Sequence, residues 1–255
     1  MAKAISFNSN SLQTANILTQ HIAHLGGPEI DADMTAIVHG NRSVIPYIDY
    51  PNRKIKVSGM IIGSSPADVE DRIDDFHYAL IGKDMNLDID HAGATRRYTA
   101  TKTNVSVDQP DGLSYAYFSI TFSCTHPFGY SSSSETLFTV SASTLASNPQ
   151  AVTLNGSAPY QYPIVTVTYS AVSGSGTVVI GNGTTTQTAS ITRTWTNGDV
   201  LVVNPMTQMV TVNGDEVQVV GAVPLFLTGA NTITYTDDFA SRTYDYTATY
   251  QRSFM

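Results

Sequence analysis

The sequence has little cysteine and no long apolar run. Its single cysteine, Cys124, cannot form a disulfide bridge within the chain, which argues against a disulfide-built secreted scaffold and fits folding in a reducing cytoplasm. Residues 1–11 contain one Lys and no apolar stretch of signal-peptide length, and no run elsewhere is long enough to cross a bilayer. We therefore expect neither membrane insertion nor export through a signal peptide.

Positive charge is also scarce. The chain has 13 Lys and Arg against 21 Asp and Glu, which gives a net charge of −8. Because gripping a phosphate backbone needs a basic surface, we expect no stable binding of nucleic acid. The common catalytic signatures are missing too: there is no Walker A loop, no Gly-x-Ser-x-Gly, no Cys-x-x-Cys, and no Gly-x-Gly-x-x-Gly after a strand. We predict that the chain is not an enzyme and uses no cofactor.

What the sequence does contain is typical of a β-rich protein. Hydrophobic residues make up 42% of the chain and charged residues only 13%, and Thr, Val and Tyr are abundant. A length of 255 residues favours two domains, each able to bury its own core. A Ser/Thr/Ala-rich stretch at 131–150, with one short strand-like run at 137–140, suggests the boundary. We predict domains at 1–131 and 132–255.

One segment of the first domain predicts a helix. Ser65 suits the N-cap and Pro66 the first helical position, and Gly82 supplies a stop, so the helix is expected over 66–81. An apolar stripe at helical spacing should face a sheet or another subunit, and it consists of Val69, Ile73, Phe76 and Leu80. The opposite, solvated face carries Asp68, Asp71, Asp74 and Asp75.

Strand patterns surround this helix and fill the second half. In the first domain they favour an α+β fold with a mainly antiparallel sheet, with strands at 54–62, 85–90, 96–103 and 116–124. In the second, Asn-Gly pairs begin at 155, 182, 197 and 213, and the segments 174–176 and 181–183 suggest turns. The expected strands there are 164–169, 177–180, 200–203, 209–212, 216–219, 231–235 and 243–250. Regularly spaced short strands predict an antiparallel jelly-roll or related β-sandwich, so the whole chain is mainly β.

A few side-chain groups could carry chemistry, and for each we favour a structural role. They are Cys124 with His126 as a nucleophile pair, His21 and His24 on one helical face as zinc ligands, Asp88 and Asp90 with His91 as a cation site, and the helix carboxylates. The only tryptophan, Trp195, could stack on a sugar, although packing beside a hairpin turn is favoured. We therefore predict no catalytic, cofactor-binding or metal-binding residue, and the sequence identifies no ligand-binding residue.

The order of several segments resembles the distal tail proteins of long-tailed bacteriophages. The first-half segments are 3–7, 54–63, 66–81, 97–100 and 118–130, which ends in His126-Pro127-Phe128-Gly129-Tyr130; those of the second half are 195–199, 210–214 and 225–231. The resemblance covers nearly the whole chain and rests on order and spacing. Residues 26–46 match no part of the pattern.

This resemblance implies a structural virion protein, made in the host cytoplasm, that forms a hexameric ring at the tail tip. The first domain would form the ring, as a belt, and the second would be a galectin-like sandwich. Its partners would be the tail tube protein, the tail-tip hub or tail-associated protein, and possible receptor-binding proteins, with DNA passing through a channel. Two alternatives stay open: a carbohydrate-binding adhesin, which glycan binding by residues 132–255 would favour, and a tail tube or tube-terminator subunit.

Overall fold

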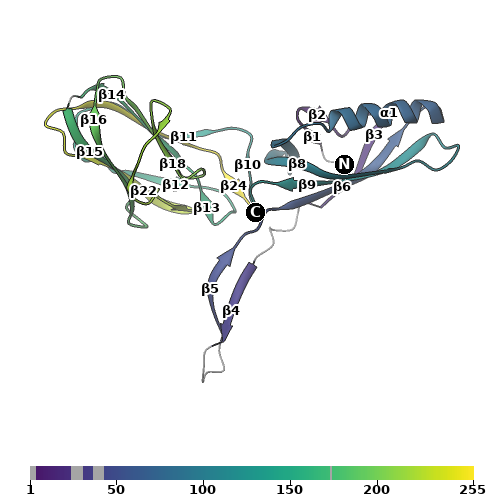
Figure 1. Ribbon diagram of the computed structural model, residues 1–255, viewed down its shortest axis with the longest axis horizontal. Coiled ribbons are helices and arrows are strands. Elements are labelled where there is room, and N and C mark those ends of the chain that lie inside the picture. The colour runs from purple at the N-terminus through teal and green to yellow at the C-terminus, as the bar shows by residue number, and fades with distance from the viewer. Residues whose placement is uncertain (1–3, 24–30, 37–42, 173) are drawn as a thin grey trace. The chain divides into compact units, whose positions relative to one another are not determined.

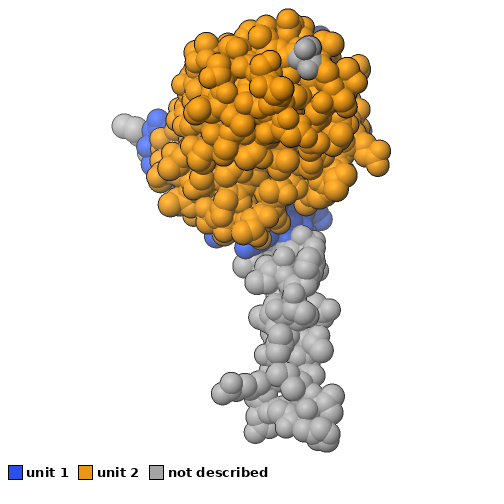
Figure 2. All heavy atoms as spheres, turned by 90° about the vertical axis from the view of Figure 1, so that its left-hand side faces the viewer, with its two compact units in different colours: residues 1–132, 255 blue, residues 133–254 orange. Residues whose placement is uncertain are grey.

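The chain divides into two units, each with its own hydrophobic core. The computed structural model describes residues 4–23, 31–36, 43–172 and 174–255, with the backbone alone for 31–36 and 43–49. Unit 1 extends to Ser132 and includes Met255, and unit 2 is Ser133–Phe254. Figure 1 shows the strands of both units and the helix of unit 1, and Figure 2 colours the two units separately.

Unit 1 is built on an antiparallel sheet with the strand order β2-β1-β7-β8-β9-β6-β3, and β10 pairs with β8. A separate pair, β4 and β5, is also antiparallel. The strands are β1 (Ile5–Phe7), β2 (Asn10–Ser11), β3 (Ile17–Ala23), β4 (Asp31–Ala36), β5 (Ser43–Asp49), β6 (Lys54–Ile62), β7 (Met85–His91), β8 (Ala94–Asp108), β9 (Tyr115–Cys124) and β10 (Gly129–Ser131).

The helix α1 (Pro66–Ala79) covers one face of this sheet (Figure 1). Ser65 caps it, since its side-chain oxygen accepts from the Asp68 N–H at 3.2 Å. The predicted apolar stripe packs toward the sheet, where the Phe76 ring lies 4.8 Å from that of Phe118 on β9. Where β3 pairs with β6, a Cβ on Gly59 would lie 2.2 Å from the Leu18 carbonyl oxygen, so this position requires glycine.

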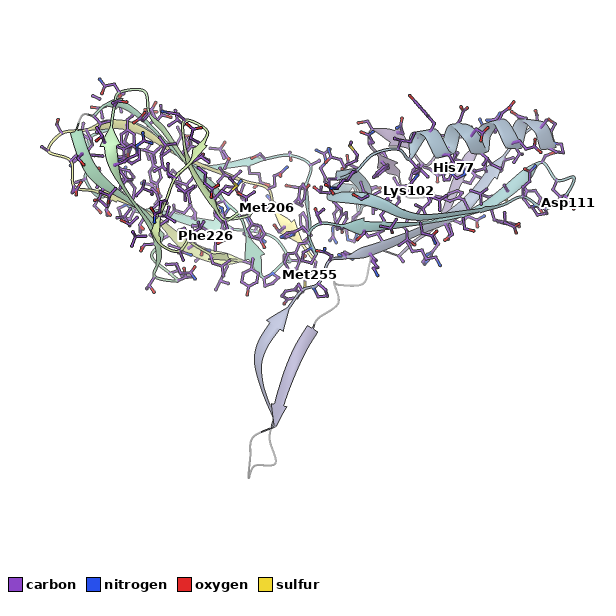
Figure 3. The ribbon with its side chains drawn as sticks, viewed as in Figure 1. His77, Lys102, Asp111, Met206, Phe226 and Met255 are labelled. Atoms are coloured by element: carbon purple, nitrogen blue, oxygen red, sulfur yellow. The ribbon has the colours of Figure 1, made fainter. Side chains whose placement is uncertain are left out.

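Unit 2 is a sandwich of two antiparallel sheets, ordered β11-β23-β14-β17-β18-β19 and β12-β22-β15-β16-β20, with the short pair β13-β21 beside them. Inward side chains of both sheets form one core, in which Phe226 is fully buried (Figure 3). The strands are β11 (Glu135–Ser143), β12 (Gln150–Leu154), β13 (Tyr160–Gln161), β14 (Ile164–Ala171), β15 (Gly174–Asn182), β16 (Gln187–Trp195), β17 (Val200–Asn204), β18 (Met209–Val212), β19 (Asp215–Glu216), β20 (Val220–Gly221), β21 (Phe226–Leu227), β22 (Gly229–Asp237), β23 (Thr243–Tyr250) and β24 (Ser253–Phe254).

The predicted mainly β class is confirmed, with antiparallel sheets and, in the described residues, one helix. This helix is too short and polar to cross a membrane. The predicted helix end was wrong: α1 ends at Ala79 with Leu80 as the C-cap, and Gly82, with φ of 143°, follows the cap. Strand β8 is longer than predicted, because a bulge between Lys102 and Asn104 lets it continue alongside β9.

Of the two turns predicted in unit 2, the first was wrong, because residues 174–176 form the start of β15. The second lies close to its predicted place: Gly181 and Asn182 end β15, and the turn that leads to β16 begins at Gly183. Glycine occurs there because the chain is closely packed: a Cβ on Gly176 would lie 2.3 Å from the Phe239 ring, and one on Gly181 would lie 2.8 Å from atoms of Thr188 and Thr234. The second arm of the hairpin after β18 is shorter than predicted, since β19 contains only Asp215 and Glu216.

Candidate functional surfaces

Cys124 and His126 do not form an activated nucleophile. Cys124 closes β9 and packs in the unit 1 core, where burial raises the pKa of its thiol to about 12, so the thiol is protonated at neutral pH. Burial also lowers the pKa of His126, whose Nδ1 accepts from the Phe128 N–H at 3.4 Å. Because a thiol attacks as the thiolate, this arrangement favours a packing role.

The carboxylates of β7 are held by neighbouring groups of the chain. Arg97 lies opposite Asp88 and donates to both of its oxygens, from Nε at 2.7 Å and from Nη2 at 2.8 Å. The same hydrogen bonding raises the pKa of Arg97. Asp90 Oδ1 accepts from the Gly93 N–H at 3.2 Å in the following turn. A cation at Asp88 would therefore have to displace a guanidinium that binds both oxygens.

The proposed histidine pair fails on its geometry. His21 lies in strand β3, opposite Ser58 of β6, so the expected helical face does not exist there. His24 lies outside the described residues. Throughout the part of the chain that the structure describes, no group of three His, Cys, Asp or Glu side chains could hold a metal ion.

Of the helix carboxylates, Asp68 belongs to the helix start. Its Oδ2 accepts from the Ser64 N–H at 2.6 Å and from the Ser64 hydroxyl at 2.9 Å, and its Oδ1 lies 3.0 Å from Arg72 Nε. These bonds, led by the one from the Ser64 backbone, lower the pKa of Asp68. Asp71, Asp74 and Asp75 are exposed, as expected of a solvated helix face.

Trp195 cannot serve as a sugar platform, because its side chain is fully buried. The indole N–H donates to the Gly176 carbonyl oxygen at 3.1 Å, and the ring lies 5.1 Å from that of Tyr169. Arg193 lies over the indole, 5.4 Å from its centroid. Trp195 thus packs in the sandwich core beside the turn that precedes β17.

The remaining candidate surface of unit 1 is the sheet face opposite α1. Along β9 the buried residues alternate with half-buried hydroxyl residues, and the neighbouring strands repeat this pattern. We call this face the hydroxyl surface, and its members are Ser58, Thr99, Thr101, Ser119, Thr121 and Ser123. The exposed side chains of Lys54 and Lys56 lie on the same face of β6. It is a polar, weakly charged surface.

Unit 2 has a comparable face on the outside of the β12-β22-β15-β16 sheet. Positions that alternate with the buried residues of these four strands carry no charged side chain, and most are Thr. We call this the threonine face, after Thr153, Thr177, Thr188, Thr192, Thr194, Thr232, Thr234 and Thr236. A shallow depression of about 420 Å³ at one end is lined partly by Ala151 and Ala230 and by no aromatic ring. Stacking on a sugar is therefore not available in this depression.

No protein-family model matches the sequence, and no curated protein matches it. Solved structures do match in fold. The Dit protein of phage SPP1, described as a paradigm of the hub adsorption apparatus in phages that infect Gram-positive bacteria, matches with a TM-score of 0.75 and 16% identity over 100% of both chains. A chain of the phage P2 baseplate, in its activated conformation with Ca, has a TM-score of 0.54 and 9% identity and covers 99% of this chain and 98% of its own. The two-unit fold is thus shared from end to end.

Proposed function

We propose that this chain is a structural virion protein that forms a ring at the distal end of a phage tail and joins the tail tube to the tail-tip hub or adhesion device. The observation that supports this most is the full-length likeness to the SPP1 Dit protein, which includes both units in the same order. A match confined to the sandwich would have supported only a widespread β-fold. No catalytic role is part of the proposal.

The two parts of the chain have different roles in the ring. Residues 1–131 form the belt of a hexameric ring, and residues 132–255 form a galectin-like sandwich that offers further surface to hub or receptor-binding proteins. The tail tube protein binds the other side of the ring, and DNA leaves through the central channel. The protein is made in the host cytoplasm and then incorporated into the virion.

Native mass spectrometry of the purified chain across a range of concentrations tests ring formation, with negative-stain images of the largest species. We expect a hexamer with an open centre. If the chain stays monomeric, adding the tail tube protein separates two explanations. A hexamer that forms only then keeps the proposal, whereas a monomer in both conditions contradicts it.

Subunits of the ring could add strands to one another's sheets, because unpaired edges would be covered by closing the ring. In unit 1 the seven-residue strand β3 is an edge of the sheet and pairs with β6, and in the sandwich the five-residue strand β12 is an edge and pairs with β22. Hydrogen exchange of the monomer and of the assembled particle would test strand addition. Protection of an edge strand only after assembly is expected; equal exchange of every edge strand in both states would contradict it.

The channel is proposed to be neutral or acidic, so that DNA passes without the counterion release that accompanies binding to basic grooves. The hydroxyl surface is our candidate lining, because its named members are uncharged. Lys54 and Lys56 already add positive charge at its β6 side, so the test measures the effect of one further lysine against that background. Phage particles carrying Thr121→Lys should then eject DNA more slowly at low salt than at high salt, because salt screens the added attraction. Thr188→Lys on the threonine face is the matched control and should leave ejection unchanged. Equal kinetics for Thr121→Lys and the wild type would show that this surface does not line the channel.

A further inference from the structure

We propose that Asn155 is the site at which the folded protein undergoes spontaneous deamidation. Unit 2 contains four Asn-Gly pairs, beginning at Asn155, Asn182, Asn197 and Asn213. Asparagine before glycine is prone to this reaction because glycine has no side chain to shield its backbone nitrogen and has unusual conformational freedom. The four pairs are chemically alike, so the fold decides which of them reacts.

The reaction needs only water. The backbone nitrogen of the glycine attacks the side-chain carbonyl carbon Cγ of the asparagine, forms a C–N bond and loses its proton, while the Cγ–Nδ2 bond breaks and ammonia leaves. The resulting five-membered succinimide is opened by water at either carbonyl. The products are aspartate and isoaspartate, in which the main chain runs through the side-chain carboxyl. Hydrogen bonds to the asparagine amide or to the glycine N–H must therefore break before the ring can close.

In two of the four pairs, the nitrogen that would attack is already hydrogen-bonded. The Gly183 N–H donates to the Thr232 carbonyl oxygen at 2.8 Å, and the Gly198 N–H donates to the Tyr169 carbonyl oxygen at 2.7 Å. The preceding amides are held as well. Asn182 donates from Nδ2 to the Leu225 carbonyl oxygen at 2.9 Å, and Asn197 Oδ1 accepts from the Val172 N–H at 2.6 Å.

In the third pair, both the oxygen and the nitrogen of the side-chain amide make hydrogen bonds. Asn213 Oδ1 accepts from the Val200 N–H at 2.9 Å, and Asn213 Nδ2 donates to Asp199 Oδ1 at 2.8 Å. This network joins two turns of the sandwich, and Asp199 also accepts from the Thr196 N–H at 2.9 Å. Ring closure at Asn213 would require both side-chain bonds to break.

Asn155 differs in each respect. Its side chain is exposed, and among the described residues neither its amide nor the Gly156 N–H makes a hydrogen bond; the Asn155 backbone N–H alone donates, to the Tyr250 hydroxyl at 3.1 Å. Glycine is nevertheless required at 156, because its φ is 155° and a Cβ would lie 2.3 Å from Gln161 Nε2 and 2.4 Å from the Ser253 carbonyl oxygen. The fold therefore requires glycine at 156, next to an asparagine whose side-chain amide makes no hydrogen bond.

Peptide mapping by mass spectrometry of the full chain, incubated at mildly alkaline pH in buffer and in concentrated urea, tests the proposal. In buffer we expect Asn155 to convert at least about tenfold faster than each of the other three, which corresponds to about 1.4 kcal/mol of hydrogen bonding that must be broken at those pairs. In urea the four rates should converge, because the hydrogen bonds are lost. Asn155→Gln should remove the fast product.

Two outcomes would overturn the proposal. One is a rate at Asn155 in buffer that is no faster than at Asn182, Asn197 or Asn213. The other is an equally large lead for Asn155 in urea, which would mean that local sequence and not the fold sets the rate. Circular dichroism of Asn155→Gln before incubation confirms that the variant is folded, so a missing product is attributed to the missing amide.

Discussion

Removal of the Asp237 carboxylate should destabilise unit 2 strongly. Its Oδ1 lies 2.8 Å from Arg242 Nε and accepts from the Phe239 N–H at 3.0 Å, and its Oδ2 accepts from the Tyr235 hydroxyl at 2.6 Å. The Asp237 side chain is 0% exposed and that of Arg242 only 11%. The ion pair is thus shielded from water, which distinguishes it from the more exposed pair of Arg252 and Glu135.

Asp237→Asn keeps the shape of the side chain and removes its charge. Breaking a buried ion pair from one side costs about 3–5 kcal/mol, because the remaining charge is buried without compensation. For a unit of this size, each 1 kcal/mol lowers Tm by about 3–6 °C, so we expect a fall of roughly 10 °C or more. Arg242→Met breaks the same pair from the other side and should cost a similar amount, since either remaining charge keeps hydrogen bonds to neighbouring groups of the chain.

Trp195 makes the measurement specific to unit 2. It is the only tryptophan and is fully buried in that core, so its fluorescence during urea unfolding reports the sandwich. The double variant Asp237→Asn/Arg242→Met should lose at least about 1 kcal/mol less than the sum of the single losses, because the pair interacts directly. Additive losses, or a loss below about 1 kcal/mol for Asp237→Asn, would refute the reasoning.

Three further predictions concern unit 1 and the Trp195 contact. Cys124 should not react with iodoacetamide at pH 8 in the native protein and should react in urea. Because the pKa of its thiol is about 12 in the folded protein and ordinarily 9.0, burial of the neutral thiol contributes fully to stability below pH 9, and this contribution is lost as pH rises toward 12. Urea titrations followed by circular dichroism at pH 8 and about 10.5 would detect the loss. Gly59→Ala should cost about 3 kcal/mol or more, because the added methyl group overpacks the contact with Leu18. Gly93→Ala should cost about 1–2 kcal/mol, because Gly93 has open space around it but a φ of 83°. Similar Tm values for the two variants would refute the crowding at Gly59. Trp195→Phe should cost about 1–3 kcal/mol by leaving the Gly176 carbonyl oxygen without its donor, and a thermal melt unchanged from the wild type would contradict this.

Local signals predicted the elements whose structure depends on local chemistry. The start of α1 follows from Ser65 and Pro66, and both β6 and β23 have the predicted bounds because their apolar alternation is regular. The turn predicted at 174–176 failed for a reason that local sequence cannot supply: Gly176 lies where the ring of Phe239, from a distant part of the chain, comes close. Strands β3 and β16 were not predicted, although β16 spans nine residues.

Whether a candidate residue is available to a ligand depended even more on strand pairing than the positions of the strands did. Asp88 and Asp90 do share a strand, as predicted, but only the pairing of β7 with β8 shows that Arg97 binds both Asp88 oxygens. The burial of Trp195 likewise depends on its pairing with Gly174 across β15 and β16, which the sequence does not reveal. The full-length resemblance could be recognised from the order of the segments along the chain, because that order can stay the same where individual side chains differ.

The edges of the sheets limit how copies of the chain could associate. The Ile17 and Thr19 N–H groups on β3 donate to the side chains of Thr14 and Gln13, at 3.0 Å and 2.8 Å, so the start of that edge is already covered. In unit 2, β19 and β20 contain two residues each, and the pairing of β11 with β23 has two register irregularities. Short or irregular edges are poor templates for strand addition. Strand β12, whose register with β22 is regular over five residue pairs, is therefore the edge at which strand addition between the sandwiches of neighbouring copies should be tested first.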